Sequence, residues 1–324
     1  MTISVNPCRL ASAVAVLAAV LPVAAQEVSI AFPRNGERLP AITNVYCIGH
    51  VPTNASHALT VNGVTTDVYR TGAFLAMVPV REGTNEITAV WGTNSFVSTV
   101  TVAPERHGAS APVPSPPRDP YKDLGIPTNA VFASSPPYGR KPCEVYVMVD
   151  AGHGGSDSGT LSPHGWREKD VNLQQALAIR DALHLAGFNV VMTREDDSFP
   201  PLYSRPRKAW QLKVDAFISV HHNATAANRD PRLARHTTAY ASNEKGMELA
   251  AAIQRHIGRE LAPLKDCGAQ MKSLAVCRNP AIPSCLLEVD FINLPEGEEE
   301  SWDPARQKRV AKAVVMGLLD WMTE

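Results

Sequence analysis

The sequence lacks an excess of charge of either sign. Its 324 residues include 31 Lys and Arg against 32 Asp and Glu, a formal net charge of −1. Because binding to a nucleic-acid backbone needs clustered positive charge, this balance removes the simplest case for a nucleic-acid binder. Charged residues make up 19% and apolar residues 44% of the chain, which argues against a disordered protein. The composition indicates a folded chain, and its length favours two domains.

Long apolar runs are absent after the first 26 residues. Near the N-terminus, Arg9 precedes the apolar run Ala11 to Leu21, and small residues follow up to Ala25. This order predicts a signal peptide over residues 1–25, and therefore export to the periplasm, the cell wall or the extracellular space. A retained N-terminal anchor is the alternative. The run is short for a membrane span of about 20 residues, so we expect no membrane span after cleavage.

Cysteine is scarce, and its pairing is ambiguous. The chain has six cysteines, and cleavage after residue 25 would remove Cys8 and leave five. An odd number leaves at least one thiol unpaired or joined to something else. Export permits disulfides, and Cys267 with Cys277 is a nearby pair that is able to bridge. Three connectivities are equally open.

Residues 26–103 alternate as short strands separated by turn signals, of which Asn62-Gly63 is a favoured hairpin turn. The pattern predicts a small all-β sandwich. It resembles the immunoglobulin-like modules attached to exported bacterial enzymes, which implies a targeting or spacing role. It holds no cluster of His, Cys and carboxylate. Residues 104–142 carry ten of the 26 prolines and are predicted to be a Pro-rich linker. Because Pro-rich chain is extended and semi-rigid, we expect the linker to hold the two folded parts apart.

Residues 143–324 alternate between strands and helices. This order predicts an α/β fold, a mainly parallel sheet with helices on both faces. Ligands of such sheets bind beyond the carboxyl ends of the strands. Strands are expected at residues 145–149, 189–193, 216–220, 237–241 and 285–289, and helices at 170–186, 204–212, 244–260 and 304–322.

A glycine-rich turn, Asp150 to Gly159, follows the first of these strands. A dinucleotide-binding turn would need glycine at Asp157, and a phosphate-binding loop would need lysine at Thr160. A serine nucleophile elbow would need serine at Asp157. What remains is His153 on a tight turn at a strand end, a position suited to a metal ligand, although a lone histidine is more often structural.

Polar residues also end two other predicted strands. His221, His222 and Asn223 follow the strand at 216–220. Glu288 lies in the last predicted strand, and Asp290 follows that strand. Because the carboxyl ends of parallel strands meet at one edge, these residues are expected to converge with His153.

Together these blocks resemble the zinc-dependent N-acetylmuramoyl-L-alanine amidases of the Amidase_3 type, over about 180 residues from Glu144. The resemblance rests on residues 147–159, 168–173, 193–194, 202, 205, 215–224, 288, 291 and 293, which stand in the family's order. It implies a fold like that of zinc amidases and zinc exopeptidases. It also implies Zn²⁺ bound by His153, Glu168 and His221, with Glu288 as the catalytic residue.

The implied reaction is hydrolysis of peptidoglycan at the amide bond between N-acetylmuramic acid and L-alanine of the stem peptide. Three protein ligands leave a position for water, which zinc acidifies while it polarises the amide carbonyl. Glu288 would take the proton from water and pass it to the departing amine. A catalytically silent wall-binding protein and a zinc peptidase acting on another amide are the alternatives. An activator protein, if there is one, is not identified by the sequence.

Each site residue has a structural alternative. Glu168, taken alone, is typical of a solvated helix start. His222 competes with His221, but successive strand residues point to opposite faces, and the Ser-x-His-x-Asn block favours His221. Asp290 departs from the family, which usually has a small residue there, so we expect its side chain to point away or to be paired. The other histidines are expected to be surface or core residues, and the run Glu296 to Glu300 a solvated loop.

Overall fold

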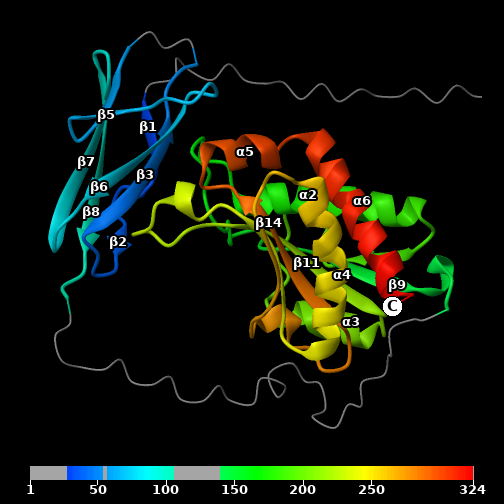
Figure 1. Ribbon diagram of the computed structural model, residues 1–324. Helices are drawn as coiled ribbons and strands as arrows, with labels where there is room; N and C mark the ends of the chain where they lie inside the picture. The colour runs from blue at the N-terminus through cyan, green and yellow to red at the C-terminus, as the bar shows by residue number, and fades with distance from the viewer. Residues whose placement is uncertain (1–27, 54–56, 106–138, 324) are drawn as a thin grey trace, which may run out of the picture.

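The computed structural model describes residues 28–53, 57–105 and 139–323 (Figure 1). The predicted signal peptide and most of the predicted linker lie outside the described residues. Within the described part of the chain, no helix is long and apolar enough to cross a membrane.

The N-terminal residues form two β-sheets, in the orders β1-β3-β6 and β2-β8-β7-β4-β5. Apolar residues of both sheets, such as Val45 and Ile87, are fully buried and form a shared core. The predicted all-β region is therefore confirmed. Three strands were not expected, because each is only two to four residues long. The strands are β1 (Ser29–Phe32), β2 (Arg38–Leu39), β3 (Asn44–His50), β4 (Leu59–Val61), β5 (Val64–Thr66), β6 (Ala73–Pro79), β7 (Gly83–Trp91) and β8 (Asn94–Val102).

The predicted hairpin turn lies between β4 and β5. Asn62 and Gly63 have φ of +48° and +78°, the left-handed values that a two-residue hairpin turn requires. Asn62 Oδ1 also accepts a 2.7 Å hydrogen bond from the backbone N–H of Thr88 in β7. The turn is therefore tied to the neighbouring strand.

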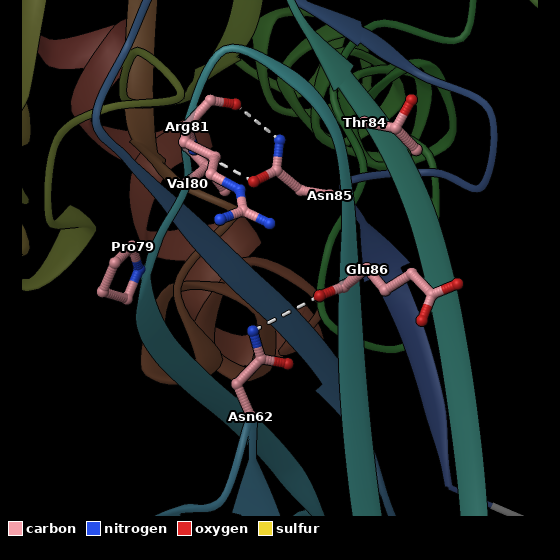
Figure 2. Close-up of a pocket in the computed structure, with 7 residues that line it drawn as sticks. All are labelled: Asn62, Pro79, Val80, Arg81, Thr84, Asn85 and Glu86. Atoms are coloured by element: carbon pink, nitrogen blue, oxygen red, sulfur yellow. Dashed lines mark hydrogen bonds between the residues drawn. The ribbon is translucent and has the colours of Figure 1, made fainter.

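A hollow of about 600 Å³ lies beside this turn (Figure 2). Its two asparagines are engaged with backbone groups: Asn62 Nδ2 lies 3.4 Å from Glu86 O, and Asn85 bonds both the N–H and the C=O of Arg81. These side chains hold the strands and the β6–β7 connection. Among the described residues, the sandwich contains no group of three or more His, Cys, Asp and Glu able to hold a metal.

The C-terminal residues form a six-stranded sheet in the order β10-β9-β11-β14-β12-β13. Four of the neighbouring pairs are parallel, and β12 with β14 is antiparallel. The predicted mainly parallel sheet is therefore confirmed. One strand, β13, was missed because its sequence, Asp-Cys-Gly-Ala-Gln-Met, has no β-branched or aromatic residue. The strands are β9 (Tyr146–Ala151), β10 (Asn189–Met192), β11 (Ala216–Asn223), β12 (Thr237–Ala241), β13 (Asp266–Met271) and β14 (Ser284–Phe291).

Helices cover both faces of this sheet, as predicted (Figure 1). One face packs against α2 (Glu168–Leu185), α4 (Glu244–Glu260) and α6 (Pro304–Trp321). The other face packs against α3 (Ser204–Gln211) and a short 3₁₀ turn, Ala275–Cys277. The side chains of Asn243 and Asp303 cap α4 and α6 by accepting hydrogen bonds from the first turn.

The predicted solvated loop at Glu296 to Glu300 is wrong. Residues Pro295–Ser301 form helix α5, with proline at its first position and acidic residues in its first turn, where the helix dipole favours them. Glu298 is 1% exposed, and its Oε2 lies 2.7 Å from Nδ1 of His164. The partner is 134 residues away in the chain, so no local pattern could show that this carboxylate is buried.

The sandwich contacts the α/β domain directly, which contradicts the expectation that the linker holds the two apart. Leu294 packs against Tyr46, Ile48 and Leu75 on the outer face of the first sheet. The backbone N–H of Tyr46 donates a 2.9 Å hydrogen bond to Ala227 O. The proline content of the linker does not determine whether the two domains touch. The contact depends on the apolar residues on the two domain surfaces that meet.

All five described cysteines are free thiols. Cys47, Cys277 and Cys285 are buried in the cores, where burial raises the pKa of each thiol. The pairing considered for Cys267 and Cys277 is not formed.

Candidate metal centre

Three predicted ligands meet at the carboxyl ends of β9 and β11. His153 follows β9, His221 lies in β11, and Glu168 is the first residue of α2. One ligand atom from each lies within 4.8 Å of the other two. Nε2 of His153 and Nδ1 of His221 are each 3.1 Å from the same carboxylate oxygen, Glu168 Oε1. The structure therefore brings together a His–Glu–His group that is able to hold a metal ion.

His153 stands on a strained turn. Its φ is +60°, in the left-handed region, and the next residue, Gly154, has φ of +133°. Nδ1 of His153 lies 2.9 Å from Asp157 Oδ2. Because an ionised carboxylate only accepts hydrogen bonds, Nδ1 carries the proton and Nε2 is left for a metal. The carbonyl of His153 accepts a 2.7 Å hydrogen bond from Arg205, which fixes the backbone of the turn.

Two glycines allow the backbone to close around the ligands. A Cβ at Gly152 would lie 2.2 Å from Nε2 of His221, and a Cβ at Gly159 would lie 2.5 Å from Glu168 Oε2. Two imidazoles and one carboxylate are a donor set that zinc uses in catalytic sites. The donor set and the close-fitting turn therefore fit a zinc ion.

Glu168 is not a solvated helix start. It is 5% exposed, and it accepts hydrogen bonds from Asn172 Nδ2 at 3.1 Å and from the backbone N–H of Thr160 at 3.0 Å. Burial opposes ionisation, but the hydrogen bonds to His153 and His221 outweigh it and hold the pKa of Glu168 well below its ordinary value. The carboxylate is therefore ionised and fixed where a metal ligand is needed.

His222 faces the helix layer, away from the His–Glu–His group. Its Nδ1 lies 2.8 Å from Asn172 Oδ1, and its side chain is buried. Burial lowers the pKa of His222 to about 4, so this imidazole is neutral. Asn172 thus contacts both His222 and Glu168, and it links β11 to α2 behind the group.

Asp290 is paired, as predicted. It is fully buried and accepts hydrogen bonds from Arg235 at 2.9 and 2.8 Å and from Arg306 at 2.7 Å. Two guanidinium groups therefore neutralise this carboxylate.

Glu288 lies on β14 opposite His221 on β11, outside the three-residue group. Its Oε2 is buried without a hydrogen-bond partner. Burial raises the pKa of this carboxyl to about 7. A buried carboxyl oxygen without a hydrogen-bond partner is costly, and such groups gather at catalytic sites. The arrangement suits a general base beside the metal ligands.

Behind the ligands, sequence reasoning missed a network around Asp150. This buried carboxylate accepts hydrogen bonds from Arg205 at 2.7 Å, and from Ser219 and Thr193 at 2.6 Å each. It joins the ends of β9, β10 and β11 just before the residues of the site. A sequence motif gives the types and order of these residues, and it carries no sign of the contacts between them.

A mixed sheet covered by helices, with a His–Glu–His group at the carboxyl ends of its parallel strands, defines an α/β domain with a candidate metal centre. Residues 147–320, more than half of the chain, match the model of the Amidase_3 family, described as N-acetylmuramoyl-L-alanine amidase. The chain belongs to this family.

Relatives and solved structures agree with this assignment. The probable cell wall amidase LytH of Staphylococcus epidermidis is 31% identical over 205 residues, which cover 63% of this chain and 65% of LytH. The N-acetylmuramoyl-L-alanine amidase AmiC of Neisseria meningitidis is 39% identical over 225 residues, which cover 56% of this chain and 52% of AmiC. The chain thus spans less than two thirds of the length of these relatives.

Two solved structures share the fold. The amidase AmiC2 of Nostoc punctiforme matches with a TM-score of 0.52 and 28% sequence identity, and the match covers 55% of this chain and 97% of the AmiC2 chain. The catalytic domain of CwlV from Bacillus (Paenibacillus) polymyxa matches with a TM-score of 0.51 and 29% sequence identity, and the match covers 55% of this chain and 98% of the CwlV chain.

Proposed function

We propose that this protein is a zinc-dependent amidase that hydrolyses peptidoglycan at the bond between N-acetylmuramic acid and L-alanine of the stem peptide. The observation that carries the proposal is the meeting of His153, Glu168 and His221 at one sheet edge. Glu288, whose Oε2 is buried without a hydrogen-bond partner, lies on the adjacent strand. Membership of the amidase family supports the choice of substrate.

In this proposal, His153, Glu168 and His221 hold the zinc. When bound there, zinc supplies Lewis-acid chemistry, which polarises an amide carbonyl and acidifies water. Asp157 keeps the proton on Nδ1 of His153 and so keeps Nε2 free for binding. Glu288 takes a proton from the attacking water and delivers it to the nitrogen of the departing L-alanine.

We also propose that the protein is exported, because its substrate lies outside the cytoplasmic membrane. The N-terminal signal sequence expected over residues 1–25 supports this location. The relative LytH is named a cell wall amidase, which agrees with it.

The proposed function is tested with metal-free protein that is reloaded with zinc and incubated with purified peptidoglycan sacculi. Mass spectrometry should find free stem peptides that begin with L-alanine, and only in the zinc-loaded sample. Zinc binding without any product would indicate a silent wall-binding protein. Cuts within the stem peptide would indicate a zinc peptidase.

A further inference from the structure

An exposed apolar surface adjoins the turn that carries His153. Phe199, Leu202 and Tyr203, here called the apolar rim, are 45%, 48% and 40% exposed. They lie in the connection between β10 and α3. Grouped apolar side chains that remain exposed on a folded protein often mark a binding surface.

The apolar rim is fixed to the metal-site turn. A Cβ at Gly155 would lie 3.0 Å from Cβ of Phe199, so the two backbones are in close contact. Asp197 Oδ1 accepts a 2.9 Å hydrogen bond from the N–H of Gly155. The buried Lys169 donates to Asp197 at 2.6 and 2.7 Å and to Gly155 O at 2.8 Å. A surface held in this way loses little conformational entropy when a ligand binds.

The charges beside the rim favour an uncharged ligand. Glu195, Asp196 and Asp197 precede it in the chain, and two of these carboxylates are paired, Glu195 with Arg180 and Asp197 with Lys169. Two of the neighbouring cations are buried and engaged: Arg194 donates to the carbonyls of Ala151, Gly152 and Lys169, and Arg205 donates to Asp150. The stem peptide of peptidoglycan carries carboxylates, whereas the sugars of its glycan strand are uncharged. The rim itself is uncharged, and the charges beside it are largely paired, so this side of the site suits an uncharged sugar.

A cation lies toward the other end of the sheet. The rim follows β10, at one end of the strand order, and Lys272 follows β13, at the opposite end. Because β13 runs antiparallel to β10, the backbone of Lys272 lies at the other edge of the sheet, and its side chain extends over Tyr240 in β12 toward the site. The ammonium of Lys272 lies 4.5 Å from the ring centroid of Tyr240, and its charge acts on Glu288. A carboxylate of a stem peptide would be attracted to this side. The two ends of the site therefore differ in the chemistry that they accept.

We propose that the apolar rim binds sugar rings of the glycan strand, next to the muramoyl residue whose amide is cleaved. The acidic stem peptide then extends toward Lys272. Sugar rings present C–H groups on one face, and these pack against aromatic and aliphatic side chains. This inference rests on the proposed function, because it names the part of the same substrate that the rim contacts.

The test compares two substrates that carry the same stem peptide, one on a single N-acetylmuramic acid and one on a tetrasaccharide of the glycan strand. The wild-type protein is expected to have the higher kcat/KM on the tetrasaccharide. Phe199→Ser and Tyr203→Ser should each reduce this preference about tenfold, mainly through a higher KM for the tetrasaccharide. Leu212→Ser is the control, because Leu212 is 50% exposed, directly follows α3 and lies outside the rim.

A second measurement separates the rim from the chemistry. Calorimetric titration with a peptide-free tetramer of N-acetylglucosamine should show that wild type binds the tetramer. Both rim variants should have an affinity for the tetramer that is about tenfold lower. If wild type binds the tetramer through the rim and cleaves neither substrate, the proposed function fails and the sugar-binding rim stands. Folded rim variants that keep the wild-type preference and the wild-type tetramer affinity would overturn the inference, as would equal losses on both substrates.

Discussion

The carboxylate of Asp157 lies 2.9 Å from Nδ1 of His153, on the side of the imidazole away from Glu168. This contact fixes the tautomer and the orientation of the ring, so that Nε2 faces the carboxylate of Glu168 at 3.1 Å. The turn, the tautomer and the buried carboxylate together prepare the group for a metal ion.

Replacing Asp157 should therefore weaken metal binding. We expect Asp157→Ala to lower zinc affinity about 10- to 100-fold, the usual effect of removing a carboxylate that orients a histidine ligand. Asp157→Asn should lose less zinc affinity, because the amide oxygen of asparagine is still able to accept a hydrogen bond from Nδ1–H of His153. Competition with a chelator of known affinity measures the change without any substrate. Equal zinc affinity in all three proteins would show that Asp157 does not orient the ligand.

Glu288 should be needed for hydrolysis and not for metal binding. Glu288→Ala is expected to retain zinc, because Glu288 stands outside the three-residue group. Its rate on peptidoglycan should fall about 10²- to 10⁴-fold, the usual contribution of a general acid–base residue. Metal analysis and product release from the same protein sample check both parts. Full activity in this variant would remove Glu288 from the mechanism.

Gly159 should tolerate no side chain. A methyl group there would lie 2.5 Å from Glu168 Oε2, and the φ of +61° already disfavours alanine. Gly165→Ala is the matched control, because Gly165 has φ of +75° with no atom within 4 Å of the added Cβ. Both variants should lose roughly 1 kcal/mol of stability from the backbone conformation. Only Gly159→Ala should also lose zinc affinity, as measured by chelator competition. Equal zinc affinity of the two variants would contradict the close fit between Gly159 and Glu168.

The junction between the sandwich and the α/β domain should respond to pH. His164 points Nδ1 at Glu298 at 2.7 Å and Nε2 at Thr71 O at 3.0 Å, so both nitrogens must carry protons to satisfy both acceptors. The hydrogen bond to Glu298 raises the pKa of His164, while the stacked ring of His50, 4.8 Å away, has its pKa lowered by burial.

A raised folded-state pKa fixes the sign of the effect. The stability that His164 contributes is fully present below its unfolded pKa of about 6.5 and is lost as the pH rises through the higher folded value. We expect the Tm difference between wild type and His164→Gln to be largest at about pH 5.5–6 and to shrink above neutrality. His184→Gln, at an exposed position in α2, is the control. A Tm difference independent of pH would contradict the charged contact.

The sequence was sufficient for features that leave a local signal. Strands and helices of the α/β domain follow from apolar runs and caps. His153 follows β9 and His221 lies near the end of β11, and those runs fix the positions of both strands. Pairing was one of the two outcomes predicted for Asp290, because a second carboxylate facing the site would raise the pKa of Glu288.

Contacts between distant residues could not be predicted. Glu298 looked solvated within its acidic run, since its partner His164 lies in another part of the chain. Leu294 gave no sign that it packs against Tyr46 in the sandwich, because complementary surfaces have no period in the sequence. The apolar rim was not recognised either, since Phe199 and Tyr203 stand among prolines in a connection without regular structure.

The zinc-loaded protein is proposed to cleave the bond between the lactyl group of N-acetylmuramic acid and L-alanine. Digestion of sacculi in H₂¹⁸O, followed by mass spectrometry, shows which bond takes up the water. We expect one ¹⁸O atom in the lactyl carboxylate of the glycan product, and an unlabelled stem peptide with a free L-alanine amine. Label at a carboxyl group within the stem peptide, or no labelled product from protein shown to contain zinc, would contradict the proposed cleavage.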